Sequence, residues 1–160
     1  MTYVGAGETS ALLRPRDEVE TLTLRRARVG LVAPGAVTRE HFGLFRYDME
    51  PRAGGPAAHV HRTFTESFFV LAGTVRVYDG RAWAEATIGD YFYVPEGGIH
   101  AFRNDAPEPA SMLILFAPGT PREKYFAELA DIAASGRTLE PDEWAELYAR
   151  HDQLMVDPPG

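Results

Sequence analysis

The sequence contains no cysteine among its 160 residues. This absence excludes a disulfide framework, a thiol nucleophile, an iron–sulfur cluster and a cysteine-ligated zinc site. Lysine occurs once, at Lys124, where we expect a helix to begin. A Schiff-base mechanism would depend on that one residue, so we do not expect such chemistry here.

Basic residues are also scarce. Sixteen Lys and Arg residues stand against 23 Asp and Glu residues, which gives a formal net charge of −7. The small cluster of Arg25, Arg26 and Arg28 indicates a solvated surface, and no basic stripe predicts a nucleic-acid partner. No apolar run approaches the ~18 residues that a membrane-spanning helix needs. Met1–Gly7 lacks the pattern of a signal peptide, so we expect a cytoplasmic protein without a membrane partner.

Hydrophobic residues make up 45% of the chain and charged residues 24%, as in ordinary single globular domains. After an expected strand around Phe42–Tyr47 and a Gly/Pro-rich loop at 51–56, short apolar runs follow one another. They cover 57–62, 66–72, 74–79, 82–87, 91–95, 99–103 and 110–117. Turn signals separate them, including Asp79-Gly80, which is typical of a tight hairpin. This pattern predicts an all-β sandwich or barrel.

The last quarter of the chain has helical spacing instead. Residues 120–123 look like a capping box with Pro at the first helical position, and Ser135-Gly136 suits a helix end. A second helix is expected from about Pro141, with Trp144, Leu147 and Tyr148 on one face. We expect these helices to pack against the barrel, and a lid over its mouth is the functional alternative.

Five histidines are present, and two of them form the pair His59-x-His61. Residues i and i+2 of a strand point to the same face, so the two imidazoles can share one metal ion. Glu66 follows after a gap that allows a bend into the next strand, and His100 must come from a separate strand. His41 and His151 have no neighbour at ligand spacing, and we expect both at the surface.

The glycines, prolines and asparagine around these residues strengthen the hypothesis. The two segments are Gly54-x4-His59-x-His61-x4-Glu66-x6-Gly73 and Gly89-x5-Pro95-x-Gly97-x2-His100-x3-Asn104. Together they resemble the paired motifs of the cupin superfamily, apart from a leading Gly one residue closer to the histidines than usual. The resemblance implies a double-stranded β-helix (a jelly-roll barrel) with a short C-terminal helical segment. It also implies that His59, His61, Glu66 and His100 hold one divalent metal ion, for which Mn, Fe, Co, Ni, Cu and Zn all remain open.

Within the cupins, the plan of the chain is similar to that of the small single-domain quercetin dioxygenase-like proteins. The similarity includes the segment Pro118-Gly119-x-x-Arg122-x-x-Tyr125-Phe126. It implies oxygen-dependent cleavage of a flavonol-like or other small aromatic substrate, with Glu66 as acid/base. A metal-dependent isomerase or cyclase acting on a polyketide- or sugar-like carbonyl compound is one alternative, and a non-catalytic binding protein is another.

Three further expectations complete the sequence-based picture. One domain is divided into an N-terminal extension at 1–35, a barrel at 36–118 and helices at 119–155. A homodimer is expected, because cupins often pair through exposed strands. Strand parity places six candidates in a substrate pocket: Tyr47, Phe64, Phe68, Phe92, Phe102 and Met112. No arginine is placed beside the ligands by the sequence, which weakens the case for an anionic substrate.

Overall fold

Antiparallel strands make up most of the fold in the computed structural model, which describes residues 10–157. The strands are β1 Thr21–Thr23, β2 Ala27–Ala33, β3 Gly43–Met49, β4 His59–Val60, β5 Thr65–Ala72, β6 Val75–Tyr78, β7 Trp83–Ala86, β8 Tyr91–Val94, β9 Ala101–Arg103, β10 Ala110–Ala117 and β11 Leu154–Met155. The helices are the 3-10 turn η1 Arg16–Glu18, α1 Arg122–Ser135 and α2 Pro141–Arg150. Met1–Gly7, which lacks a signal-peptide pattern, lies outside the described residues.

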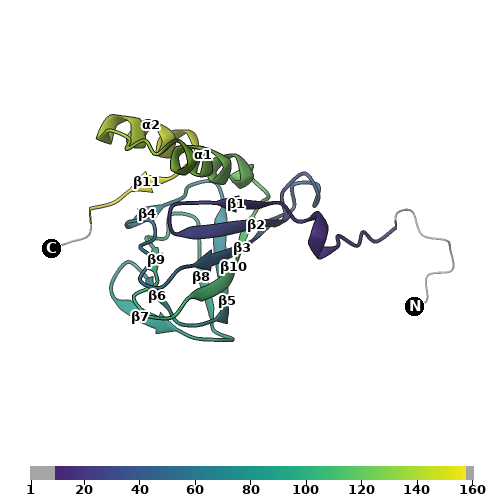
Figure 1. Cartoon of the computed structure of the whole chain (residues 1–160), viewed down its shortest axis with the longest axis horizontal. Coiled ribbons are helices and arrows are strands. Elements are labelled where there is room, and N and C mark those ends of the chain that lie inside the picture. The colour runs from purple at the N-terminus through teal and green to yellow at the C-terminus, as the bar shows by residue number, and fades with distance from the viewer. Residues whose placement is uncertain (1–9, 158–160) are drawn as a thin grey trace.

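The strands form a six-stranded sheet in the order β1-β2-β3-β10-β5-β8, a three-stranded sheet β7-β6-β9 and the small pair β11-β4. The two helices lie side by side across one end of this barrel, and β11 runs beneath them (Figure 1). The predicted double-stranded β-helix with a C-terminal helical segment is confirmed. No helix within the described residues is long and apolar enough to cross a bilayer.

Strand register determines which side chains enter the barrel. In the central strand β10, Ile114 lies between Phe45 of β3 and Phe68 of β5, and all three are buried. Two residues further along β10, Phe116 lies opposite Glu66. Because side chains alternate along a strand, Glu66 shares the inner face with this apolar row. The structure therefore places a carboxylate inside a hydrophobic core.

Some of the turns and helix ends predicted from the sequence are present in the structure and others are not. The hairpin at Asp79-Gly80 is confirmed, with Gly80 at φ +89°, and α1 ends at Gly136 in the left-handed conformation. The capping box predicted at 120–123 is wrong: α1 begins at Arg122 after a non-helical Pro121, without a side-chain cap. A capping box is present at α2, between Glu140 and Glu143.

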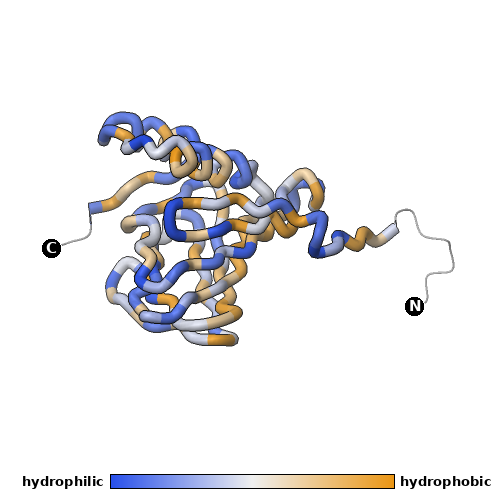
Figure 2. Tube along the Cα trace, in the orientation of Figure 1, coloured by the Kyte–Doolittle hydropathy of each residue, from blue (hydrophilic) through white to orange (hydrophobic). Residues whose placement is uncertain are grey.

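The N-terminal segment contributes to the main sheet, because β2 pairs with β3 along most of its length. The turn between β1 and β2 is strongly hydrophilic (Figure 2). The three-part division at residues 35 and 118 stays a prediction.

Candidate metal centre

Four side chains from two segments of the chain meet inside the barrel. His59 begins β4, His61 follows it, Glu66 is in β5 and His100 directly precedes β9. Each residue is at most 4% exposed, and each offers a ligand atom within 4.8 Å of the others. The backbones of His59 and His100 exchange two hydrogen bonds of 3.0 Å, so β4 and β9 fix these two histidines against each other.

Backbone carbonyls determine which nitrogen of each imidazole faces the centre. Nδ1 of His59, His61 and His100 lies 2.7, 2.6 and 3.0 Å from the carbonyl oxygens of Ala57, Asp152 and Gly98. A carbonyl oxygen only accepts hydrogen bonds, so each Nδ1 carries the proton. In the neutral rings Nε2 then presents its lone pair to the centre, which is the arrangement that metal-ligating histidines require.

The carboxylate of Glu66 is held by two of the imidazoles. Its Oε2 lies 2.8 Å from Nε2 of His100 and 3.2 Å from Nε2 of His61. Burial alone would raise the pKa of Glu66, but its contact with His100, which donates a hydrogen bond to it when both ring nitrogens are protonated, and the interactions with both histidines outweigh burial and lower the pKa below its usual range. Glu66 is therefore ionised at neutral pH.

Burial acts differently on His59, which lies near Glu66 but, unlike His61 and His100, forms no ion pair with it within 4.0 Å. Burial, together with the nearby His100, lowers the pKa of His59 to about 3. Burial also disfavours the charged form of His100, yet its contact with Glu66 outweighs this effect and raises its pKa. A neutral His59 is ready to donate a lone pair to a cation.

The donor set fits a divalent transition metal ion. Three imidazole nitrogens and one carboxylate oxygen suit several first-row metals. Although Nε2 of His61 lies near Glu66, it is buried without a hydrogen bond of acceptable geometry. A buried polar atom without a partner is costly, and a cation at the centre would satisfy it. The four residues can hold a metal ion, as the sequence predicts.

The C-terminal segment orients His61, which the sequence did not reveal. Oδ2 of Asp152 accepts hydrogen bonds from the backbone N–H groups of Arg62 and Thr63 at 2.9 and 2.8 Å and from the Thr63 hydroxyl at 2.7 Å. These bonds hold the Asp152 carbonyl against Nδ1 of His61, and β11 pairs with β4 directly afterwards. Ninety-one positions separate the two residues, so no local pattern indicates their contact.

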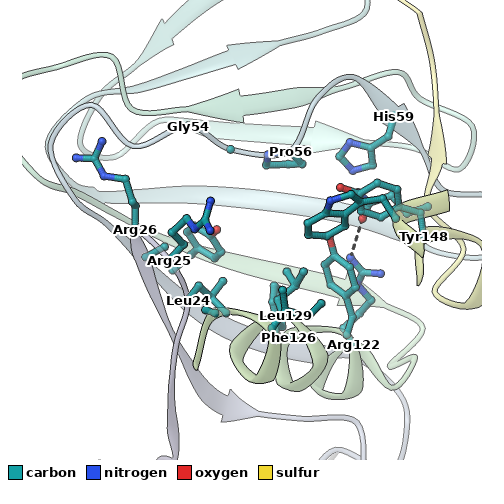
Figure 3. A pocket seen from close by; sticks show the side chains of 18 of the residues that line it. Leu24, Arg25, Arg26, Gly54, Pro56, His59, Arg122, Phe126, Leu129 and Tyr148 are labelled. Atoms are coloured by element: carbon teal, nitrogen blue, oxygen red, sulfur yellow. Dashed lines mark hydrogen bonds between the residues drawn. The ribbon is translucent and has the colours of Figure 1, made fainter. Parts of the chain in front are cut away.

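A cavity of about 440 Å³ opens onto two of the metal-site residues, His59 and Glu66. Its wall also includes side chains of both helices, among them Phe126, Leu129 and Tyr148, which lie across from His59 (Figure 3). Such a volume is typical of sites for small molecules. The helices do more than pack against the barrel, because they form one wall of the cavity.

The six aromatic and apolar residues predicted for the pocket separate into two groups. Tyr47 and Phe102 line the cavity. The other four are not among its lining residues and belong to the apolar packing: Phe64, Phe68, Phe92 and Met112. Strand parity correctly turns most of these side chains inward, but it does not distinguish the core from the cavity. Contact of Tyr47 and Phe102 with a substrate stays a prediction.

Arg122 also lines this cavity, although the sequence placed no arginine beside the ligands. Its side chain is buried at 4% exposure at the start of α1. The segment Pro118–Phe126 contains this arginine, but its pattern does not indicate where the side chain lies.

The other two histidines are not in the metal centre. His41 is exposed, as expected. The expectation of an exposed His151 is wrong: its side chain is 12% exposed and lies against Tyr125, with Nε2 2.9 Å from Glu128. The end of α2 folds back onto α1, which removes His151 from the surface.

The comparisons agree with this fold. Residues 45–116 match the family model of the cupin domain. None of the curated proteins matches the chain. Many solved structures do match, at low identity, and together with the family model they support assignment to the cupin superfamily.

Three of the similar structures illustrate the range of relatives. One is a predicted oxalate decarboxylase from Thermotoga maritima, with 13% identity, covering 67% of this chain and 99% of that chain at a TM-score of 0.60. Another is the polyketide cyclase RemF from Streptomyces resistomycificus, with 16% identity, 68% and 80% coverage and a TM-score of 0.58. A sugar phosphate isomerase from Silicibacter pomeroyi has 22% identity, 63% and 72% coverage and a TM-score of 0.54. At these identities the likeness concerns the fold alone.

Proposed function

We propose that this chain is a metal-dependent enzyme, acting in the cytoplasm, that cleaves a flavonol-like or other small aromatic enol substrate with dioxygen. The observation that carries the proposal is the position of Glu66. It belongs to the group His59, His61, Glu66 and His100, and it also faces the largely apolar cavity of about 440 Å³. The proposed metal-binding residues and the proposed substrate space are therefore adjacent.

Each residue has a role in this proposal. His59, His61 and His100 would hold the metal through Nε2, and Glu66 would be the fourth ligand. When bound, the metal would supply a Lewis acid and a template for the substrate and dioxygen. Glu66, ionised at neutral pH, accepts the proton of the substrate hydroxyl. Tyr47 and Phe102 bound the cavity on the barrel side, and the helices exclude water from the other.

One observation favours a second candidate. Buried Arg122 would stabilise a negatively charged oxygen of an enolate without consuming dioxygen. Such chemistry is typical of a metal-dependent isomerase or cyclase, and a cyclase and an isomerase are among the proteins of similar fold. The dioxygenase remains the first choice, because the whole-chain resemblance favours it.

Oxygen uptake tests the two candidates against each other. Protein reconstituted in turn with Mn, Fe, Co, Ni and Cu is assayed against a panel of aromatic substrates led by quercetin, with metal content measured in every sample. We expect metal-dependent uptake that is lost in Glu66→Gln and kept in Glu85→Gln, an exposed glutamate of β7. No uptake by metal-loaded protein would overturn the dioxygenase in favour of the isomerase or cyclase. If the metal-loaded protein neither consumes oxygen nor converts any substrate of the panel to a product, a non-catalytic binding protein would remain.

A further inference from the structure

Arg122 is a buried cation whose hydrogen bonds are mostly unmade. Its Nη1 donates to the carbonyl of His151 at 2.9 Å, and its Nη2 lies 3.5 Å from Oε1 of Gln153. Its Nε is buried without a hydrogen-bond partner. Within residues 10–157 no carboxylate lies within 4.0 Å of the guanidinium. A guanidinium stays charged in proteins, so this charge has no direct counter-ion.

Aromatic rings surround the guanidinium. Its central carbon lies 4.1 Å from the ring centre of Tyr125, 5.1 Å from that of Phe116 and 5.4 Å from that of Phe64. Ring faces attract a cation, which offsets part of the cost of its burial. They also hold the planar group in one orientation. They accept no strong hydrogen bond from Nε, so that donor still needs an oxygen.

The cavity as a whole favours a negatively charged ligand. Among the described residues, four arginines and one acidic residue, Glu66, line it, although the chain carries a net charge of −7. Arg26 and Arg137 are paired with glutamates. Arg25 lies with Arg26 toward one end of the cavity, whereas Arg122 lies toward the other end, across from His59 (Figure 3). A divalent ion held by Glu66 would make the electrostatic potential at the end of the cavity near His59 and Glu66 more positive.

We infer that Arg122 anchors the anionic group of the ligand, and that the ligand is a small aromatic carboxylic acid. Its carboxylate accepts a hydrogen bond from the guanidinium of Arg122, which lines the cavity, and its ring lies in the apolar part of the cavity beside Leu129 and Tyr148. The inference rests on the proposed function for the aromatic character of the ligand. Within the proposed function it favours, over a flavonol, an aromatic enol substrate that also carries a carboxylate, because a carboxylate brings a full negative charge to the buried guanidinium.

A purely structural role for Arg122 is the competing explanation, since its bond to His151 also tethers the end of α2. The two roles differ in charge selectivity. A tether affects all ligands of one shape equally, whereas an anion anchor favours the charged member of a matched pair. The test therefore uses 2-naphthoate and 2-naphthamide, which have the same ring system and nearly the same size.

Binding of both probes to metal-free protein near neutral pH is measured by calorimetry. We expect wild type to prefer 2-naphthoate by at least about tenfold, as for a hydrogen bond between charged groups. In Arg122→Met the preference should fall to within about twofold, while the affinity for 2-naphthamide stays within about threefold. Arg28→Gln removes the same charge from an exposed position outside the cavity and should keep the preference.

Equal affinity of wild type for the two probes, or no binding of 2-naphthoate, would overturn the inference. So would a folded Arg122→Met protein that still prefers 2-naphthoate about tenfold. If circular dichroism shows that Arg122→Met does not fold, Arg122→Lys replaces it, because lysine keeps the charge and lacks the planar guanidinium. The inference then requires that wild type prefers 2-naphthoate and that Arg122→Lys retains part of this preference. Binding to metal-free protein requires no reaction, so the two proposals can fail separately. If wild type prefers 2-naphthoate but metal-loaded protein takes up no oxygen, only the dioxygenase proposal is refuted.

Discussion

Asp152 gives the sharpest test of how the metal centre is built, because it acts on His61 without belonging to the centre. Its carboxylate accepts three hydrogen bonds from Arg62 and Thr63, and its own carbonyl accepts the Nδ1 proton of His61. Its backbone is in the left-handed region at φ +50°, which alanine adopts at a cost. Asp152→Ala therefore removes three bonds and adds backbone strain.

The expected losses follow from these contacts. Three partly exposed hydrogen bonds contribute about 0.5–1 kcal/mol each, and the strain adds about 1 kcal/mol, so the free energy of unfolding should fall by about 2–4 kcal/mol. The Asp152 carbonyl would then no longer be fixed against His61. Loss of such a partner typically weakens metal binding by about 10–100-fold. Asp152→Gly lacks the strain and should lose less stability, but as much metal affinity.

Metal affinity is measured by competition with a chelator, and stability by denaturant unfolding of metal-free protein. Asp90→Ala is the matched control, because its carboxylate likewise accepts bonds from a backbone N–H and a hydroxyl, both of Thr87, in a turn outside the centre. It should lose stability and keep metal affinity. A folded Asp152→Ala protein that binds metal as tightly as wild type would refute the argument.

Three further predictions concern the histidines and the outer sheet. His100→Ala should lose its roughly stoichiometric metal, as measured by elemental analysis, whereas His41→Ala should keep it. Burial, with His100 beside it, lowers the pKa of His59 to about 3, against about 6.5 in an unfolded chain. The unfolded metal-free chain therefore binds a proton below pH ~6.5 that the folded chain does not, and stability should fall by about 2–3 kcal/mol at pH ~4.5. Denaturant unfolding checks this loss, which should disappear in His59→Asn. The proposed homodimer would bury the outer face of β5 and β8, where Phe69 and Tyr91 are 42% and 62% exposed. Phe69→Glu should give a monomer by light scattering, and a monomeric wild type would contradict the proposal.

The parts of the fold that local patterns determine could be predicted from the sequence. Alternating apolar residues and Gly/Pro turns gave the seven short strands from residue 57 to residue 117 with small errors at their ends. The ligand group was predictable because the pattern His59-x-His61 places two imidazoles close together, although β4 itself ends at Val60, and the remaining motif spacing is regular. Glu66 and His100 needed the family resemblance, since no local pattern brings β5 and β9 together.

Features that depend on tertiary packing were not predictable in this way. The capping box was expected at Thr120, whose side-chain oxygen is instead buried without a partner. The box at Glu140 was missed because glutamate is not a favoured N-cap residue. Arg122 resembled an ordinary charged residue at a helix start, and only the rings of Tyr125, Phe116 and Phe64 around it reveal its burial.

The part of the chain that matches the cupin model differs from the part that completes the cavity wall. All four proposed ligands lie within residues 45–116, the part that matches the cupin model. Arg122, both helices and Asp152 lie beyond it, yet they form a wall of the cavity and orient His61. The barrel alone therefore supplies the four residues that could hold a metal ion, independently of the reaction proposed above. Because about half of the residues that line the cavity come from the C-terminal segment, proteins that share only the barrel need not share a ligand. Substitutions at Arg122 and in α2 should therefore alter ligand preference at constant metal content, whereas substitutions of the four ligands should abolish metal binding for every ligand alike.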